Sequence, residues 1–190
     1  MNQAEDAVQR FLEGDEEAFS RLVRQWEVKV YNLAWRFLGN REDAQDIAQE
    51  TFLSVFKSIR QLRDPKSFQT WLYRIALNHC RAHWRRQTQE VSLDDSVSGD
   101  DGNIPEPIAA GQENRDPLEV TDLLRKALTG ISEHHRAAII LKEYVGLNLE
   151  EVAVVMDCPL STAKSRLYHG LRGVQRNLKR IGVKGLQAGS

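Results

Sequence analysis

Cysteine is scarce in this chain, and long apolar segments are missing. Cys80 and Cys158 are the two cysteines, too few for a disulfide scaffold, and a cytoplasmic chain would keep both thiols reduced. No run approaches the roughly 18 apolar residues that a membrane-spanning helix requires. The first residues, MNQAEDAVQR, lack the basic and then apolar order of a signal peptide. We therefore expect a cytoplasmic protein.

Residue sets that would support catalysis are also missing. The sequence has no Ser/His/Asp arrangement, no glycine-rich loop of the kind that cradles phosphate and no obvious pair of carboxylates. His79, Cys80 and His83 are spaced like metal ligands, but structural zinc usually takes four ligands and no fourth Cys or His lies nearby. The sequence predicts a protein that is not an enzyme, with no metal and no cofactor.

Strand patterns are lacking as well, because no segment alternates apolar and polar residues for long. Apolar residues instead recur every three or four positions, as on one face of a helix. Asp15 is suited to cap the second of these helices, and Gly39 is suited to end it. Before residue 90, the predicted helices cover 6–13, 15–39, 42–59 and 67–86.

The stretch 87–117 breaks the helical pattern. It is rich in Ser, Gly, Asp and Pro and nearly devoid of large apolar residues, so it cannot bury enough surface to offset its chain entropy. The predicted fold class is therefore all-α, with two small helical domains joined by a flexible acidic linker and a helix-turn-helix in the C-terminal domain. The predicted boundaries are 1–88 for the first domain, 89–117 for the linker, 118–180 for the second domain and 181–190 for the tail.

Charge is distributed unevenly although the net charge is only −1. Residues 57–88 carry 8 basic and 1 acidic side chains, and residues 158–190 carry 7 basic and none acidic. Two basic blocks in a nearly neutral chain indicate two surfaces that meet phosphate, or two that meet an acidic partner. Ordinary solvated helix faces would give the same charge pattern, so charge alone leaves these readings open.

The segment 148–167 has the pattern of a helix-turn-helix. A short helix over 148–156 precedes a turn at Asp157-Cys158, and Pro159 suits the first turn of the next helix. Asp157 stands where such turns often have glycine, and Asp tolerates a left-handed backbone better than most residues. On the second helix, the predicted buried stripe is Ala163, Leu167, Leu171, Val174 and Leu178. The opposite face has basic and hydrogen-bonding groups: Ser161, Thr162, Lys164, Ser165, Tyr168, His169, Arg172 and Arg176.

Such a face suits the DNA major groove, and the dipole of the helix favours phosphate at its N-terminus. The alternative is an antiparallel helical pair with a basic exposed side.

In the first basic block, residues 57–88, aromatic side chains such as Trp71 and Tyr73 alternate with Arg74 and Asn78. Interleaved rings and cations suit single-stranded nucleic acid, although these aromatic residues would equally serve as core.

Four segments together resemble one protein family. They are GDEEAF at 14–19, DAQDIAQETFLSVFKSI at 43–59, SFQTWLYRIALN at 67–78 and the long segment at 131–171. In this order they resemble the extracytoplasmic-function sigma factors, the compact members of the main bacterial sigma family. Local departures are Leu160-Ser161, where a glycine often precedes the threonine, and Ser132, where proline is usual.

The resemblance implies a function and a set of roles. The function would be to bind RNA polymerase core, direct it to specific promoters and assist promoter melting without nucleotide hydrolysis. The genes controlled would form a stress or envelope-response regulon. The partners implied are RNA polymerase core enzyme, promoter DNA and an anti-sigma factor, often membrane-bound, with no small-molecule substrate. Residues implied for core polymerase are Asp46, Gln49, Glu50 and Leu53. Those implied for the −10 element are Phe68, Trp71, Tyr73, Arg74 and Asn78. Those implied for the −35 element are the exposed residues of the second helix given above, from Ser161 to Arg176.

Two other classes of protein remain as alternatives. The segment 147–167 also resembles the helix-turn-helix of response regulators, but those proteins usually carry a βα receiver or ligand domain, and no strand pattern is present here. A helical nuclease or other enzyme would need a catalytic set that the sequence does not offer. Stoichiometric binding to RNA polymerase core would separate a sigma factor from both.

Overall fold

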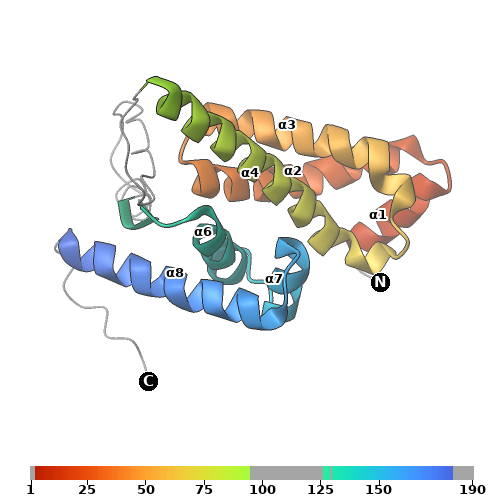
Figure 1. Cartoon of the computed structure of the whole chain (residues 1–190). Helices are drawn as coiled ribbons and strands as arrows, with labels where there is room; N and C mark the ends of the chain where they lie inside the picture. Colours follow the sequence, from red (N-terminus) through yellow and green to blue (C-terminus); the bar gives the residue numbers. More distant parts are fainter. Residues whose placement is uncertain (1–2, 95–125, 129, 182–190) are drawn as a thin grey trace.

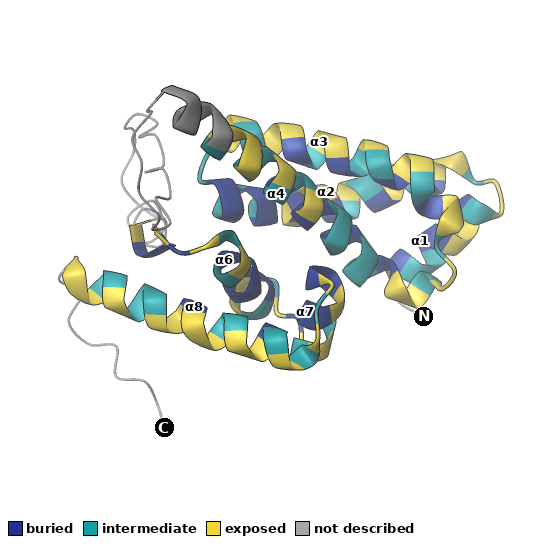
Figure 2. Cartoon of the chain, viewed as in Figure 1, coloured by how far each residue is buried: buried dark blue, intermediate teal, exposed yellow. Residues whose placement is uncertain are grey.

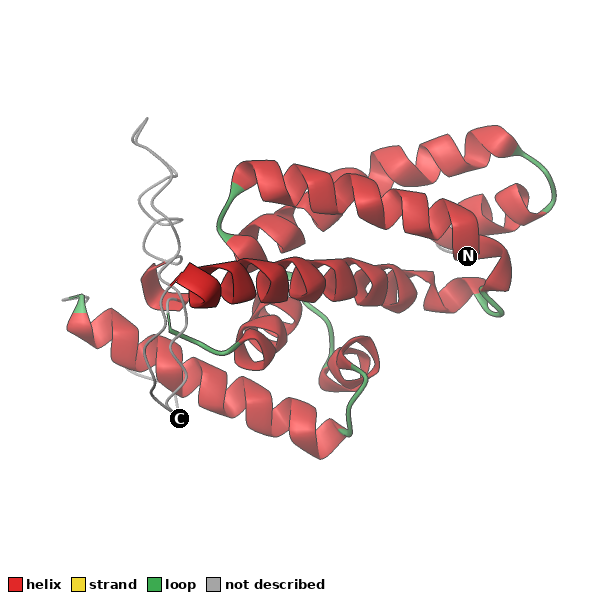
Figure 3. Ribbon diagram, turned by 45° about the horizontal axis from the view of Figure 1, so that its top comes forward, coloured by secondary structure: helices red, strands yellow, loops and turns green. Residues whose placement is uncertain are grey.

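The computed structural model describes residues 3–94, 126–128 and 130–181. Within those ranges the chain forms helices and no strand, as predicted, and Figure 3 shows helices joined by short loops. The helices are α1 (Gln3–Leu12), α2 (Glu16–Leu38), α3 (Arg41–Ser58), α4 (Phe68–Asp94), α6 (Glu133–Ile139), α7 (Leu149–Met156) and α8 (Leu160–Arg180). Two short 3-10 turns, η1 (Ile59–Gln61) and η2 (Pro65–Ser67), and a π-helical turn, η3 (Ile140–Tyr144), complete the set.

Side-chain caps define the first helix boundaries. The carboxylate of Asp15 accepts the backbone N–H of Ala18 at 3.2 Å and so begins α2. Gly39 ends that helix in the left-handed conformation, with φ 79°. Asn40 then accepts the N–H of Glu42 at 2.8 Å and begins α3. The sequence prediction of these three boundaries is confirmed to within a residue or two.

Helix α4 is longer than expected. It runs to Asp94, whereas the sequence predicted an end near residue 86 and a linker from residue 89. Gln87 donates to the carboxylate of Asp43 at 3.0 Å, and the hydroxyl of Thr88 donates to the carbonyl of Trp84 at 3.1 Å. Because adding residues to an existing helix is far easier than nucleating one, the packed part of α4 extends into the polar sequence. The remainder of the predicted linker, 95–117, lies outside the described residues.

The two helical units lie directly against each other. Figure 1 shows α6 and α7 between α4 above and α8 below, and α4 packs on α7 while α2 packs on η3. One apolar cluster is continuous across both units, with Phe37 and Leu77 on one side and Leu141 and Leu147 on the other. The sequence predicted two separate domains on a tether and gave no indication of this contact.

Candidate nucleic-acid and polymerase interfaces

The helix-turn-helix is built as the sequence predicted. Asn148 and Glu151 form a reciprocal capping box at the start of α7, with both bonds at 2.8 Å. Asp157 ends α7 in the left-handed conformation, with φ 52° and ψ 55°, the geometry for which glycine is usually selected. Ala153 is buried where the helices approach. Pro159 then stands at the start of α8.

Most of the predicted polar residues of α8 are exposed, and Figure 2 shows exposed positions along the length of this helix. Lys164 and Tyr168 are exposed, the latter by 57%, whereas Thr162 is half-buried. The guanidinium of Arg172 lies over the ring of Tyr168, at 5.6 Å from its centroid. The other exposed residues of this face are Ser161, Ser165, His169, Arg172 and Arg176.

The buried stripe of α8 is rotated from the predicted one. Ala163 is buried, but Leu171 is 40% exposed and Gly170 is buried in its place. A Cβ on Gly170 would lie 2.9 Å from Cδ1 of Ile139 and 3.0 Å from the carbonyl of His135. The helix therefore turns its glycine toward α6, because only a residue without a side chain permits this close approach. A pattern based on apolar residues cannot detect such a contact.

Two residues predicted to contact −10 bases lie in the core instead. Phe68 is 1% exposed and Tyr73 is 3% exposed. Both rings meet Trp26 edge to face, at centroid distances of 5.8 and 5.9 Å, and burial raises the pKa of Tyr73 to about 12. In this arrangement neither ring can stack on a base, so for these two residues the core alternative is the correct one.

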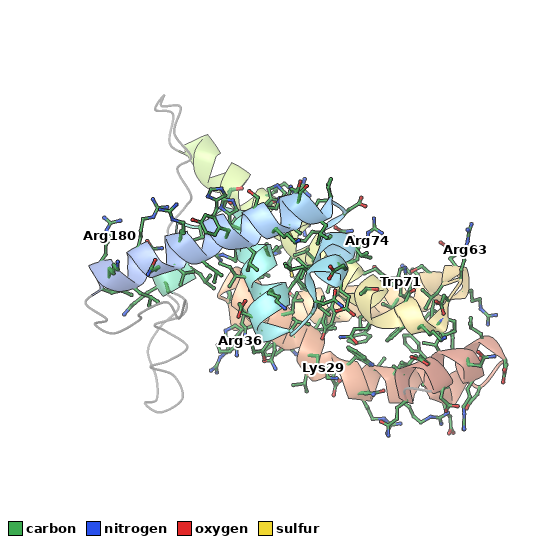
Figure 4. All side chains as sticks on the ribbon, turned by 90° about the horizontal axis from the view of Figure 1, so that it is seen from below. Lys29, Arg36, Arg63, Trp71, Arg74 and Arg180 are labelled. Atoms are coloured by element: carbon green, nitrogen blue, oxygen red, sulfur yellow. The ribbon has the colours of Figure 1, made fainter. Side chains whose placement is uncertain are left out.

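The remaining predicted −10 residues of α4 lie at its surface. Asn78 is exposed, and Trp71 and Arg74 are partly exposed. Figure 4 shows Arg74 where α4 meets the second unit, with Trp71 one turn earlier. The guanidinium of Arg74 forms an ion pair of 2.7 Å with Asp157, the turn residue of the helix-turn-helix.

The predicted polymerase-binding face of α3 is available to a partner. Asp46, Gln49 and Glu50 are exposed and Leu53 is 60% exposed. The opposite side of the helix is buried through Ala44, Ile47, Thr51 and Val55.

Histidines of α4 contact α3, a role that the sequence reading missed. Nδ1 of His79 lies 3.2 Å from a carboxylate oxygen of Glu50, and Nε2 lies 2.9 Å from the hydroxyl of Ser54. His83 lies 3.3 Å from the carboxylate of Asp43. Both histidines therefore link α4 to α3. Among the described residues, no group of three or more potential ligands could hold a metal ion.

Arg136 is the second feature that the sequence did not reveal. Its guanidinium is buried and donates to the carbonyls of Phe37 at 2.6 Å and Leu128 at 2.8 Å. It also lies over the ring of Trp84, at 4.4 Å from the centroid. Burial lowers the pKa of Arg136 to about 10, so it still carries its charge at neutral pH. No spacing rule marks an arginine for this position.

Comparison with known proteins places the chain in one family. Residues 22–90 match the model for Sigma-70 region 2, and residues 121–172 match the model for Sigma-70, region 4. The RNA polymerase sigma-H factor of Pseudomonas aeruginosa is 30% identical over 184 residues, covering 93% of this chain and 94% of that protein. The chain is an extracytoplasmic-function sigma factor. It directs RNA polymerase to promoters for the initiation of transcription, and its family consists of initiation factors rather than catalysts.

Further relatives agree with this assignment. The ECF RNA polymerase sigma factor SigW of Bacillus subtilis is 30% identical over 177 residues, covering 90% of this sigma factor and 95% of SigW. The solved structure of CnrH in complex with the cytosolic domain of CnrY matches 94% of this chain and 99% of CnrH, with a TM-score of 0.71 and 20% identity. RpoE from Bartonella quintana, solved with the anti-sigma factor NepR, matches with a TM-score of 0.67 and 24% identity, covering 85% of this chain and 96% of RpoE. The solved structures show that the fold is shared.

In the described part of this sigma factor, no helix is both long and apolar enough to cross a bilayer.

Proposed function

We propose that this sigma factor reads the −35 element through the exposed face of α8. The observation that carries the proposal is the position of Lys164, Ser165, Tyr168 and His169, all exposed in the first half of a helix that follows a left-handed helix-turn-helix turn. The N-terminal half of such a helix is the part that reaches base edges in the major groove. Arg172 and Arg176 lie farther along and suit phosphate contacts, which fix the position of the protein without reading sequence.

The −10 element is bound by the exposed residues of α4. Asn78 offers both a hydrogen-bond donor and an acceptor to an unpaired base, and Trp71 offers a ring face for stacking. Arg74 can contact the phosphate backbone once it is released from Asp157. Phe68 and Tyr73 support this surface from inside the core. Trapping unpaired bases shifts the melting equilibrium, so strand opening requires no nucleotide hydrolysis by this chain.

Core polymerase is bound through α3. The four exposed residues of the predicted site are all on one side of that helix, and Leu53 gives this side an apolar centre among polar neighbours. Interfaces commonly combine an apolar centre with a polar rim. Because Glu50 contacts His79, the polymerase-binding helix and the −10 helix are held in a fixed relation.

An anti-sigma protein is a further expected partner. CnrH and RpoE, which share the fold, were solved with the cytosolic domain of CnrY and with NepR. We propose that this sigma factor is likewise held inactive by an anti-sigma protein. It would act in the cytoplasm, where it would control a stress or envelope-response regulon.

The test of the proposed function is run-off transcription with purified core polymerase and a genomic library. We expect stoichiometric binding to core and transcripts that start at a limited set of related promoters. Free DNA binding without any association with core would contradict the proposal and would favour a DNA-binding regulator. A variant with Asp46→Ala and Gln49→Ala serves as a matched control. Both substitutions lie on the exposed side of α3, so the variant should fold normally but bind core more weakly.

A further inference from the structure

One histidine of α4 contacts the face of α3 that is proposed to bind core polymerase. Helices α3 and α4 pack side by side (Figure 1), and the ring of His79 lies between two side chains of α3. Its Nδ1 is 3.2 Å from a carboxylate oxygen of Glu50, and its Nε2 is 2.9 Å from the hydroxyl oxygen of Ser54. The side chain of Glu50 is 48% exposed in this pair. A carboxylate of the proposed polymerase-binding face therefore already has a partner within the chain.

The two contacts of His79 determine which ring nitrogen carries the proton. An ionised carboxylate only accepts hydrogen bonds, so Nδ1 of His79 is the nitrogen that donates to Glu50. In the neutral ring Nε2 is then an acceptor, and the hydroxyl of Ser54 donates to it. A second proton can enter at Nε2 without moving the ring, because the hydroxyl oxygen of Ser54 can also accept. His79 can therefore be neutral or charged in the same position.

The order Ser54, His79 and Glu50 is that of a catalytic triad, but its surroundings do not support catalysis. Ser54 lies within α3 (Arg41–Ser58), where backbone N–H groups are bonded to carbonyls of the preceding turn. No free pair of N–H groups lies beside its hydroxyl in this helix to stabilise an oxyanion. The contact with the exposed carboxylate of Glu50 is the feature that bears on function.

The exposed charges around Glu50 have one sign. Along residues 42–50 the exposed charged side chains are Glu42, Asp46 and Glu50, so a partner on this face is expected to present cationic groups. When the ring of His79 is protonated, it forms an ion pair with Glu50 and competes with such a cation. When the ring is neutral, the full charge of the carboxylate is available to the partner. Because histidine changes its charge between about pH 5 and 8, this competition occurs near physiological pH.

A second histidine on the same two helices provides an internal comparison. Among the described residues, His83 and Asp43 are the other titratable pair between α4 and α3, with Nε2 at 3.3 Å from the carboxylate. Asp43 also accepts from Gln87 at 3.0 Å, and its side chain is only 19% exposed. This carboxylate faces α4 rather than a partner. Protonation of His83 should therefore leave the affinity for core unchanged.

We propose that His79 is a positioning residue for core binding, which holds the carboxylate of Glu50 for a cationic group of the polymerase and competes with that group when the ring is charged. The inference rests on the proposed assignment of α3 to core polymerase. Core prefers the form with a neutral ring, because only that form leaves the carboxylate charge free. The affinity of this sigma factor for core therefore falls as the pH is lowered and His79 gains its second proton.

The test compares core affinities at about pH 8 and about pH 6, on either side of the usual histidine titration, at constant ionic strength. Unlabelled full-length variants displace labelled wild-type sigma factor from core, and unfolding curves at each pH check that every variant is folded. His79→Asn keeps an N–H donor near the position of Nδ1 but takes up no proton. His79→Ala removes the donor, and Glu50→Gln removes the carboxylate charge. His83→Gln is the matched control, because it makes the same kind of change at the link to Asp43.

Core has titratable groups of its own, so each affinity is expressed relative to that of His79→Asn at the same pH. Wild type should match His79→Asn at the higher pH and bind about threefold more weakly at the lower pH, which is the scale of an exposed ion pair. His79→Ala should bind more weakly than His79→Asn at both, because the carboxylate is no longer held. His83→Gln should behave as wild type. Equal affinities of wild type and His79→Asn at the lower pH would overturn the inference, and so would loss of the pH effect in His83→Gln.

Two further results separate this inference from the proposed function. Proton–nitrogen NMR of the free chain at the higher pH reports which ring nitrogen of His79 is protonated, and we expect Nδ1. A proton on Nε2 would overturn the bonding pattern and the inference with it. If Glu50→Gln binds core as tightly as wild type, the assignment of α3 to core is contradicted and the inference fails with it. If Glu50→Gln binds weakly but wild type and His79→Asn agree at the lower pH, the inference alone fails.

Discussion

The carboxylate of Asp157 lies 2.7 Å from the guanidinium of Arg74, so the turn of the helix-turn-helix proposed to read the −35 element contacts the helix proposed to bind the −10 element. Asp157 is also the one residue other than glycine with a positive φ in the described part of the chain. Its side chain is 82% exposed in this pair, and exposed ion pairs contribute little stability. The backbone conformation is therefore the larger constraint at this position.

This constraint predicts different stabilities for two substitutions of Asp157. Both Asp157→Gly and Asp157→Ala remove the ion pair, but only glycine adopts the left-handed conformation without steric cost. We expect Asp157→Gly to be more stable than Asp157→Ala by about 1 kcal/mol. Thermal and urea unfolding of the two variants would measure the difference. Equal stabilities would show that the turn has relaxed and that the backbone argument is wrong.

Gly170 and Gly173 on α8 form a second matched pair. A methyl group at Gly170 would press on Ile139 and the carbonyl of His135, whereas one at Gly173 would make ordinary contact with Ile131 at 3.4 Å. We expect Gly170→Ala to lower the free energy of unfolding by about 1–3 kcal/mol. Gly173→Ala should be neutral or stabilising by up to about 1 kcal/mol, because alanine favours the helix. The reverse order in unfolding experiments would contradict the close packing of α8 on α6.

Truncating Phe68 is expected to lower the stability of the fold, whereas truncating Asn78 is expected to slow open-complex formation. Phe68→Ala removes a buried ring and should cost about 3–5 kcal/mol of stability. Asn78→Ala, at an exposed position, should leave the melting temperature unchanged and slow the formation of the open complex. Permanganate footprinting on duplex and pre-melted promoters would check this. If a pre-melted bubble does not relieve the Asn78→Ala defect, Asn78 has no role in trapping unpaired bases.

The exposed face of α3 gives a further prediction. The double variant Asp46→Ala, Gln49→Ala should weaken binding to core polymerase about tenfold, because both residues belong to the polar face assigned to that interface. Its unfolding curve should match wild type, since neither side chain is buried. Fluorescence titration with labelled sigma factor would measure the affinity. An unchanged affinity would rule out α3 as the docking helix.

Sequence was sufficient where local chemistry decides the outcome. Asp15 caps α2 through its own side chain and Gly39 ends that helix, and the turn at Asp157 follows from the tolerance of Asp for a left-handed backbone. These effects act over a few residues, so spacing reveals them. The helical class, the exposed residues of α3 and most of the exposed residues predicted for α8 follow from periodicity in the same way.

Sequence was insufficient where distant parts of the chain decide the outcome. Phe68 became core because Trp26 of another helix covers it, and Gly170 replaced Leu171 in the buried stripe because α6 approaches closely. Arg136 is buried by an element 99 residues away in the chain. None of these partners can be found from periodicity, because each depends on how helices meet in space.

If α8 gives the polymerase its promoter preference, substitutions on its exposed face should change which −35 sequences are transcribed. Holoenzymes carrying wild-type sigma factor, Lys164→Ala or Arg176→Ala would transcribe a promoter library with a randomised −35 element. Losing a base contact typically costs about 1–3 kcal/mol and relaxes preference at one position, whereas losing a phosphate contact weakens all sequences alike. We expect Lys164→Ala to change the ranking of −35 sequences and Arg176→Ala to lower every promoter without changing the ranking. A wild-type holoenzyme with no −35 preference, or a Lys164→Ala ranking identical to wild type, would contradict the assignment of α8 to the −35 element.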